Sequence, residues 1–173
     1  IEVVHEVGGV GQHLADHLGI DFLYRCNQRT LNDQLHPWYG KLLQGIRYVL
    51  TRRGPLSLGV NQGGGFVRTR SGLNSPNMQL FFSPVSYTKA PPGQRPLMNP
   101  DPFSAFLLGA QPTQPTSRGY LEIKSADPAE PPAIYPNYLA TDYDVQEMLE
   151  SARFLRQLAG APALAQVITK EIV

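Results

Sequence analysis

The sequence lacks the features that mark several large classes of protein. It has one cysteine, Cys26, so no internal disulfide can form, and we expect a reducing, cytoplasmic location. Lys and Arg number 15 and Asp and Glu 14, and the resulting net charge of +1 gives no electrostatic reason to expect a nucleic acid or an anionic membrane as partner. No apolar run approaches the roughly 20 residues that a transmembrane helix needs.

Familiar catalytic motifs are also missing. The chain contains no G-x-S-x-G elbow, no P-loop, no C-x-x-C pair and no pair of acids of the glycosidase kind. It begins with IEVVHEV, without a methionine or a signal-peptide pattern, and we therefore expect it to be a piece of a longer polypeptide. These residues alone predict no self-contained reaction centre.

What is present indicates one globular domain over residues 1–173. A chain of 173 residues, 42% of them hydrophobic, is long enough to bury a core. Glycine and proline, 16 of each, predict many turns and long structured loops rather than a helical bundle. No internal repeat is visible.

Side-chain periodicity predicts a mixture of strands and helices. Alternation predicts strands over residues 1–7, 18–27, 66–69, 78–87, 103–111 and 119–124, whereas residues 37–52 and 163–173 are predicted as helices. Residues 56–65 read as a glycine-punctuated loop that approaches either another strand or a ligand, and residues 88–102 as a surface excursion. Cys26 is expected to be a small core residue rather than a nucleophile.

The most informative stretch runs from Thr116 to Ala159. After the strand at 119–124, a turn at residues 125–128 leads into an extended, proline-rich crossing. Thr141 has the character of an N-cap, and apolar residues then recur at helical spacing until Gly160 ends the helix. The order is therefore strand, turn, extended crossing and helix.

The N-terminal segment contains two patterns that could indicate a binding site. Gly8-Gly9-Val10-Gly11 invites a dinucleotide-binding interpretation, but Leu14 stands where the third glycine of G-x-G-x-x-G is required, so a tight turn is favoured. His13 and His17 are spaced for one helix face and would suit zinc, but no third ligand stands at a recognisable spacing. The favoured interpretation is a polar loop in which Asp16 and His17 bond to backbone.

The chain resembles the glucose–methanol–choline (GMC) flavoprotein oxidoreductases. Residues 117–139, SRGYLEIKSADPAEPPAIYPNYL, are similar to that family's segment S-R-G-x-(V/L)-x-(L/I)-x-S-x-D-P-x-x-x-P-x-I-x-P-N-Y-L. Residues 9–17, GVGQHLADH, look like its G-V-G-x-N-L-x-D-H, with His13 in place of the asparagine. The shorter blocks RGPL, GGFVR and PNMQ follow in the family's order. Within the family, the choline and alcohol dehydrogenases look most similar.

The resemblance implies an α+β fold with an antiparallel sheet of about six strands and helices packed on one face. It implies the substrate-binding domain of an FAD-dependent enzyme that oxidises choline or another primary alcohol to an aldehyde. The family's G-x-G-x-x-G loop and its H-P-x-G-T histidine motif do not occur in these residues. We therefore expect this chain alone to be inactive and to bind FAD weakly or not at all, its partner being the FAD-binding domain of the same polypeptide.

Site residues follow from the resemblance and from strand positions. The loop holding Gly11, Asp16 and His17 is expected close to the flavin. Phe66, Gln79 and Phe81 are expected to contact substrate, because they lie on strands next to the glycine-rich loop, although ordinary sheet packing explains them equally well. A non-catalytic ligand-binding or interaction domain of the same fold is the alternative function.

Overall fold

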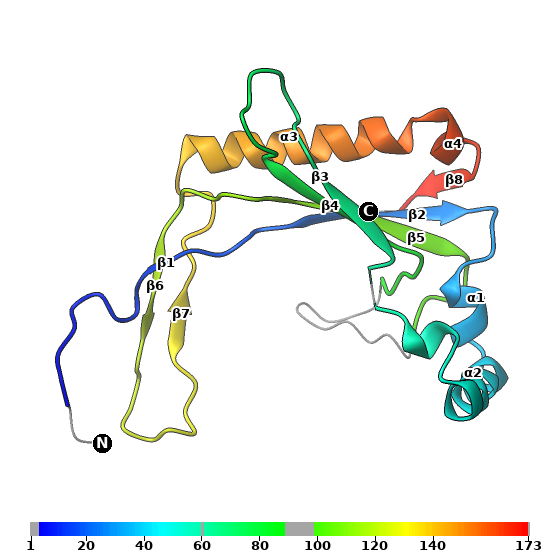
Figure 1. Cartoon of the computed structure of the whole chain (residues 1–173), viewed down its shortest axis with the longest axis horizontal. Coiled ribbons are helices and arrows are strands. Elements are labelled where there is room, and N and C mark those ends of the chain that lie inside the picture. Colours follow the sequence, from blue (N-terminus) through cyan, green and yellow to red (C-terminus); the bar gives the residue numbers. More distant parts are fainter. Residues whose placement is uncertain (1–3, 60, 89–98, 173) are drawn as a thin grey trace.

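The protein is described by a computed structural model that covers residues 4–59, 61–88 and 99–172. Two antiparallel sheets form its framework (Figure 1). The main sheet has the strand order β3-β4-β5-β2-β8, with bounds β2 Ile20–Cys26, β3 Gly63–Val67, β4 Met78–Ser83, β5 Ala105–Pro112 and β8 Ile168–Glu171. The small sheet has the order β1-β6-β7, with bounds β1 Gln12–Leu14, β6 Gly119–Glu122 and β7 Ala133–Tyr135. The predicted α+β antiparallel class is confirmed, with the strands divided between two sheets.

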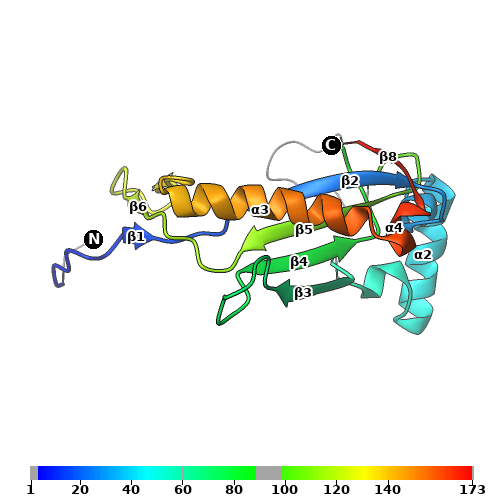
Figure 2. The ribbon, with the colours of Figure 1, turned by 90° about the horizontal axis from the view of Figure 1, so that it is seen from above.

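The core lies between the main sheet and α3, which spans Asp142–Ala159. Figure 2 shows α3 lying along the sheet. Alternate residues of β2 and β4 point toward it, because successive side chains of a strand face opposite sides. Phe22, Tyr24, Met78, Phe106, Leu108 and Leu155 make up most of this cluster. Cys26 packs at its edge, as predicted, and burial raises the pKa of its thiol.

The α3 helix begins and ends where the sequence predicts. Thr141 is its N-cap, and its Oγ1 accepts a hydrogen bond from the Asp144 amide at 3.3 Å. Gly160 follows its last residue, and Pro162 opens the short helix α4, Pro162–Ala165. Leu155 is 1% exposed whereas Leu149 is 44% exposed, so the helix buries only part of the apolar stripe that its periodicity indicated. Its other buried positions are Asp144, Glu147, Ser151 and Ala159.

Two predictions at the chain ends are wrong. Residues 163–173 do not form one closing helix, because α4 ends at Ala165 and β8 then pairs antiparallel with β2. The β-branched run of Val167, Ile168 and Thr169 suits an edge strand, and β2 supplies the hydrogen-bonding partner. In the predicted strand 1–7, the described residues Val4–Val7 form no strand.

The glycine-rich segment belongs to a strand rather than to a loop. Gly63, Gly64 and Gly65 are the first three residues of β3, an edge strand paired with β4. A Cβ at Gly64 would lie 2.3 Å from the Leu80 carbonyl oxygen, so the close neighbour of this glycine is another strand. The next strand, β4, ends before Pro84 instead of reaching residue 87, because proline cannot continue the ladder.

Two helices stand at the end of the main sheet remote from the small sheet (Figure 1). The first, α1 (Leu31–Leu35), has a capping box formed by Thr30 and Asp33. The second, α2 (Trp38–Thr51), lies within the predicted range 37–52, and its C-cap Arg52 adopts a left-handed conformation with φ 55°. A single 3₁₀ turn, η1 (Pro55–Ser57), follows. Of the residues of α2, only Gly40 is buried.

A buried carboxylate ties α3 to the segment that joins β3 to β4. Glu147, 1% exposed, accepts a hydrogen bond from Asn77 Nδ2 at 2.7 Å, and its Oε1 lies 2.7 Å from Arg70 Nη1. Arg70 also contacts Glu150, and these two carboxylates raise the pKa of the guanidinium, so it stays charged. Glu147 therefore links α3 to the segment between β3 and β4 through the Asn77 amide and the Arg70 guanidinium.

Glu147→Gln is expected to lower the free energy of unfolding by about 2 kcal/mol, because the buried Asn77 amide and the half-buried Arg70 guanidinium lose their charged acceptor. The half-exposed Glu150 provides a matched control, since Glu150→Gln removes the same charge one turn away and should cost less than about 1 kcal/mol. Urea unfolding followed by circular dichroism measures both values. Equal costs for the two variants would contradict the assignment of Glu147 as the buried anchor.

Candidate functional site

The three residues predicted to contact substrate lie on one face of the main sheet. Phe66 pairs directly with Gln79 across β3 and β4, and Phe81 follows two residues along β4. Directly paired residues and residues two apart share a face, so these side chains project together. Met78 and Phe82, at alternate positions, pack in the core beneath α3. The three residues therefore lie on the face that α3 leaves uncovered.

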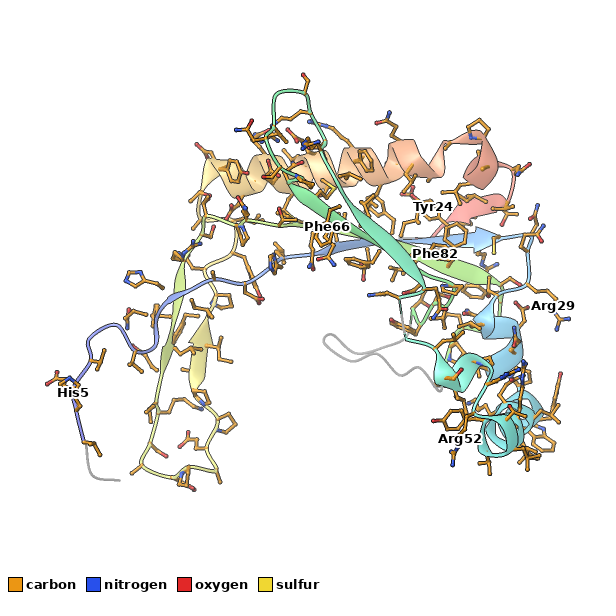
Figure 3. All side chains as sticks on the ribbon, viewed as in Figure 1. His5, Tyr24, Arg29, Arg52, Phe66 and Phe82 are labelled. Atoms are coloured by element: carbon orange, nitrogen blue, oxygen red, sulfur yellow. The ribbon has the colours of Figure 1, made fainter. Side chains whose placement is uncertain are left out.

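This face combines aromatic rings with side-chain amides. Gln79 Oε1 accepts a hydrogen bond from Gln111 Nε2 of β5 at 3.0 Å. Phe66 is 63% exposed at the sheet edge, where Figure 3 labels it on β3. Phe81 pairs with two glycines, Gly64 on one side and Gly109 on the other. Its ring covers Gly109 so closely that a Cβ there would lie 1.8 Å from the Phe81 ring.

A polar cavity of about 540 Å³ lies where the two sheets meet. Three segments supply its walls: the loop after β1, the connection from β5 to β6, and the first turn of α3. The lining residues are Ala15, Asp16, His17, Thr113, Gln114, Pro115, Thr116, Arg118 and Tyr143. Two predicted cofactor-binding residues, Asp16 and His17, thus share one cavity. The cavity residue Thr113 lies two residues after Gln111, the hydrogen-bonding partner of Gln79 on the sheet face opposite α3.

Asp16 and His17 are held by bonds to side chains and backbone. The Tyr138 hydroxyl donates to Asp16 Oδ2, and the His17 amide donates to Asp16 Oδ1 at 2.9 Å. The bond from Tyr138, then that from His17, lowers the pKa of the Asp16 carboxyl, so it is ionised near neutral pH. His17 Nδ1 lies 2.7 Å from the Pro112 carbonyl oxygen. A carbonyl oxygen only accepts, so Nδ1 carries the hydrogen and Nε2 is the acceptor of the neutral ring.

Gly11 occupies a different position from Asp16 and His17. It adopts φ +79° in the turn before β1, and its carbonyl oxygen accepts a hydrogen bond from the Leu121 amide at 2.7 Å. A Cβ at this position would lie 2.6 Å from the Leu121 oxygen, so the expected tight turn needs glycine both for its dihedral and for space. Gly11 does not line the cavity.

Sequence reasoning did not identify Arg118, Thr116 and Tyr143 as cavity residues. Arg118 Nη1 donates to the Pro115 and Ser117 carbonyl oxygens at 2.8 and 2.9 Å, which fixes the guanidinium against this connection. Asp144, at the start of α3, in turn holds Thr116 and Ser117. An acid in the first turn of a helix is a signal for such an anchor, but its partners, more than 25 residues away, are visible only in the fold.

No metal site is supported by the geometry. Among residues 4–59, 61–88 and 99–172, no three His, Cys, Asp or Glu side chains gather closely enough to hold a metal ion. His13 and His17 consequently have no third ligand within the part of the chain described. Within the same residues, no helix has the length and apolar character that crossing a membrane requires.

A profile of the GMC oxidoreductases matches residues 115–172. The chain is 36% identical over 170 residues to the oxygen-dependent choline dehydrogenase of Vibrio vulnificus, and that alignment covers 98% of this chain. It is also 32% identical to the mitochondrial choline dehydrogenase of Mus musculus and to the alcohol dehydrogenase [acceptor] of Pseudomonas putida, over 99% and 100% of this chain. This chain belongs to the GMC oxidoreductases. It spans about 29% of the length of the Vibrio relative.

Solved structures agree on the fold of this GMC chain. A formate oxidase matches 94% of it with a TM-score of 0.76 at 22% identity, and pyridoxine 4-oxidase from Mesorbium loti matches 98% with a TM-score of 0.70 at 19% identity. The chain covers 32% and 28% of these two proteins. FAD appears in the descriptions of the Aspergillus oryzae formate oxidase and of an FAD-dependent oxidoreductase from Chaetomium thermophilum.

Proposed function

We propose that this chain is the substrate-binding domain of an FAD-dependent oxidoreductase that acts on CH–OH donors. The observation that carries the proposal is the common face of Phe66, Gln79 and Phe81, open on the side opposite α3. The choline and alcohol dehydrogenases among its relatives support a primary alcohol as substrate. The domain is proposed to span residues 1–173, with the flavin held mainly by the rest of the polypeptide.

The open face suits an alcohol that carries an apolar or cationic group. The rings of Phe66 and Phe81 provide an aromatic surface, and a quaternary ammonium such as that of choline is attracted to aromatic faces. The Gln79 carbonyl already accepts from Gln111, whereas no hydrogen bond among the described residues engages the N–H donors of Gln79. These donors are suited to orient a substrate oxygen, and the rings to exclude water around it.

The polar cavity has a donor set that fits the polar edge of a flavin ring system. Asp16 and the Nε2 atom of His17 offer acceptors and Arg118 offers donors, all lining the same space. Bound FAD supplies the hydride acceptor for the oxidation of an alcohol to an aldehyde. Gly11 shapes the turn that precedes this loop. The proton acceptor for the substrate hydroxyl is proposed to lie in the H-P-x-G-T region outside these residues.

The exposed apolar residues of the small sheet favour a partner domain in the same polypeptide. Ile123, which follows β6, is 89% exposed, and Ile134 of β7 is 59% exposed. The stacked rings of Tyr120 and Tyr135 are about two-fifths exposed. A three-stranded sheet that buries neither face is marginal in water, so another surface is expected to cover it. We propose that the FAD-binding domain does so, next to the polar cavity.

The proposal predicts that Phe81→Ala, in the complete polypeptide, raises the apparent KM for the alcohol about tenfold, equivalent to about 1.4 kcal/mol. Phe66→Ala and Gln79→Ala should raise it less, because Phe66 is 63% exposed on the edge strand β3 and Gln79 is already hydrogen-bonded to Gln111. Leu149→Ala, an exposed leucine on α3, is the matched control and should leave KM unchanged. Steady-state kinetics with choline and with a neutral primary alcohol, together with the flavin absorption spectrum, provide the measurements.

An unchanged KM in all three face variants would overturn the substrate-binding assignment. Loss of flavin absorption in those variants would instead place these residues at the cofactor. The isolated 173-residue chain is expected to show no oxidation and little FAD binding in a spectroscopic titration. A stoichiometric flavin spectrum from this chain alone would refute that part of the proposal.

A further inference from the structure

The α2 helix turns its apolar side away from the protein. Helices of globular proteins ordinarily bury an apolar stripe and expose a polar one. In α2 the inward positions are polar or small: Gly40 is buried, and Gln44 and Tyr48 are half-buried. The exposed positions are apolar, with Trp38 76%, Tyr39 56%, Leu42 55%, Leu43 60%, Ile46 48%, Val49 66% and Leu50 77% exposed. The apolar face predicted by the periodicity exists, but nothing in the described part of the chain covers it.

Tight local packing fixes this orientation. A Cβ at Gly40 would lie 2.2 Å from the Gln34 carbonyl oxygen. The side of α2 that carries Gly40 therefore packs directly against the backbone of α1. The Cδ of Arg47 lies beside Gly54 at the other end. Rolling the helix to bury its leucines would replace the contact at Gly40 with a large side chain. The exposed apolar face is therefore a fixed feature of the domain surface.

The charges around this face all have one sign. At about 100° per residue, the exposed apolar side chains fill an arc of roughly 140°, and Lys41 and Arg47 border it on either side. Arg52 and Arg53 follow at the C-terminal end, where Figure 3 labels Arg52 remote from α3 and the small sheet. No Asp or Glu occurs between Gln34 and Pro100. The net charge of +1 hides this local cationic surface, because the acids are concentrated elsewhere in the chain.

We propose that α2 binds in the plane of an anionic lipid membrane, with its apolar arc in the interface and its cations at the lipid headgroups. An apolar face with Trp and Tyr, bordered by Lys and Arg, is the pattern of helices that lie on membranes without crossing them. A protein partner complementary to this surface would need acidic groups around an apolar groove, whereas anionic lipid offers both features without specific shape. The α2 helix lies at the end of the molecule away from the small sheet and its proposed partner domain (Figure 1).

Trp38 is the only tryptophan of this chain, so its fluorescence reports on the proposed contact within the domain. The test uses vesicles of phosphatidylcholine with about one third phosphatidylglycerol, and vesicles of phosphatidylcholine alone, with the complete polypeptide. Cosedimentation is expected with the anionic vesicles, at least tenfold tighter than with the neutral ones and weakened by salt. A blue shift of Trp38 emission, identified by its loss in Trp38→Phe, should accompany binding.

Two variants and a matched control identify the surface. Leu42→Ser combined with Ile46→Ser, and separately Arg52→Gln combined with Arg53→Gln, should each weaken binding at least tenfold. Leu149→Ser combined with Arg153→Gln, an exposed leucine and arginine of α3, should leave it unchanged. Circular dichroism checks that the helices remain. Binding that the α2 variants do not alter would overturn the proposal. A Trp38 emission already blue-shifted without lipid, through either self-association or cover by the rest of the polypeptide, would also overturn it.

Discussion

Asp144→Asn is expected to lower the free energy of unfolding by about 3 kcal/mol near neutral pH, because it leaves buried donors without a charged acceptor. Asp144 is 5% exposed and accepts from the Thr116 amide at 2.8 Å, the Thr116 hydroxyl at 2.9 Å and the Ser117 amide at 2.7 Å. An asparagine presents one acceptor oxygen and a donor group where two acceptor oxygens are required. Urea unfolding followed by far-ultraviolet circular dichroism measures the loss.

The same carboxylate gives a defined pH dependence. Burial would raise the pKa of Asp144, but hydrogen bonds from Ser117 and Thr116 outweigh it and lower the pKa from 3.8 to about 2. Because the folded pKa is the lower one, the stabilisation is complete above about pH 4 and is lost as the pH falls toward about 2, amounting to about 2 kcal/mol. The Asp144→Asn protein should lack this component of the acid transition.

Asp142 provides the control for both measurements. It lies in the same first turn of α3 but is exposed, so Asp142→Asn tests the helix-dipole contribution alone and should cost less than about 1 kcal/mol. A similar cost for both asparagine variants would show that helix-end charge, not the anchored connection, explains the effect. The cavity is relevant here too, because Asp144 positions the Thr116–Arg118 wall.

Gly109→Ala is the second change for which a large effect is expected, a loss of about 3 kcal/mol through overpacking. Its Cβ would lie 1.8 Å from Cε2 and 2.4 Å from Cδ2 of Phe81, and the central strand β5 cannot move without disturbing its partners β2 and β4. The ring must therefore rotate away from the sheet. In the complete enzyme this displacement should also raise KM for the alcohol, since Phe81 belongs to the proposed substrate face.

Phe81→Leu should relieve the clash, so the double variant is expected to recover at least half of the stability that Gly109→Ala loses. Gly45→Ala is the matched single substitution: nothing lies within 4 Å of a Cβ at this helical position, and it should stabilise by up to about 1 kcal/mol. Thermal and urea unfolding of the unsubstituted protein, the single variants Gly109→Ala and Phe81→Leu, their double variant and Gly45→Ala supply the comparison. Additive effects at positions 81 and 109 would contradict the close contact between them.

Local sequence patterns predicted the elements whose periodicity and end residues lie within the element itself. The strand β2, the central strand β5 and the helix α3 were all predictable, because their periodicities and the Thr141 and Gly160 ends lie within short windows. The placement of Phe66, Gln79 and Phe81 was expected only as neighbouring strand positions. Their common face depends on the pairing of Phe66 with Gln79, which is a register between two strands.

The sequence by itself determined the family, the strand and helix periodicities and the N-cap of α3, since each depends on residues close together in the chain. Only the tertiary structure decided that residues 168–171 join a sheet edge, that Asp16, His17 and Arg118 share a cavity, and that α2 faces outward. The physical reason is the same in each case. Periodicity specifies that a segment has an apolar side or an unpaired backbone edge, whereas the neighbour that covers or pairs with it comes from a distant part of the chain.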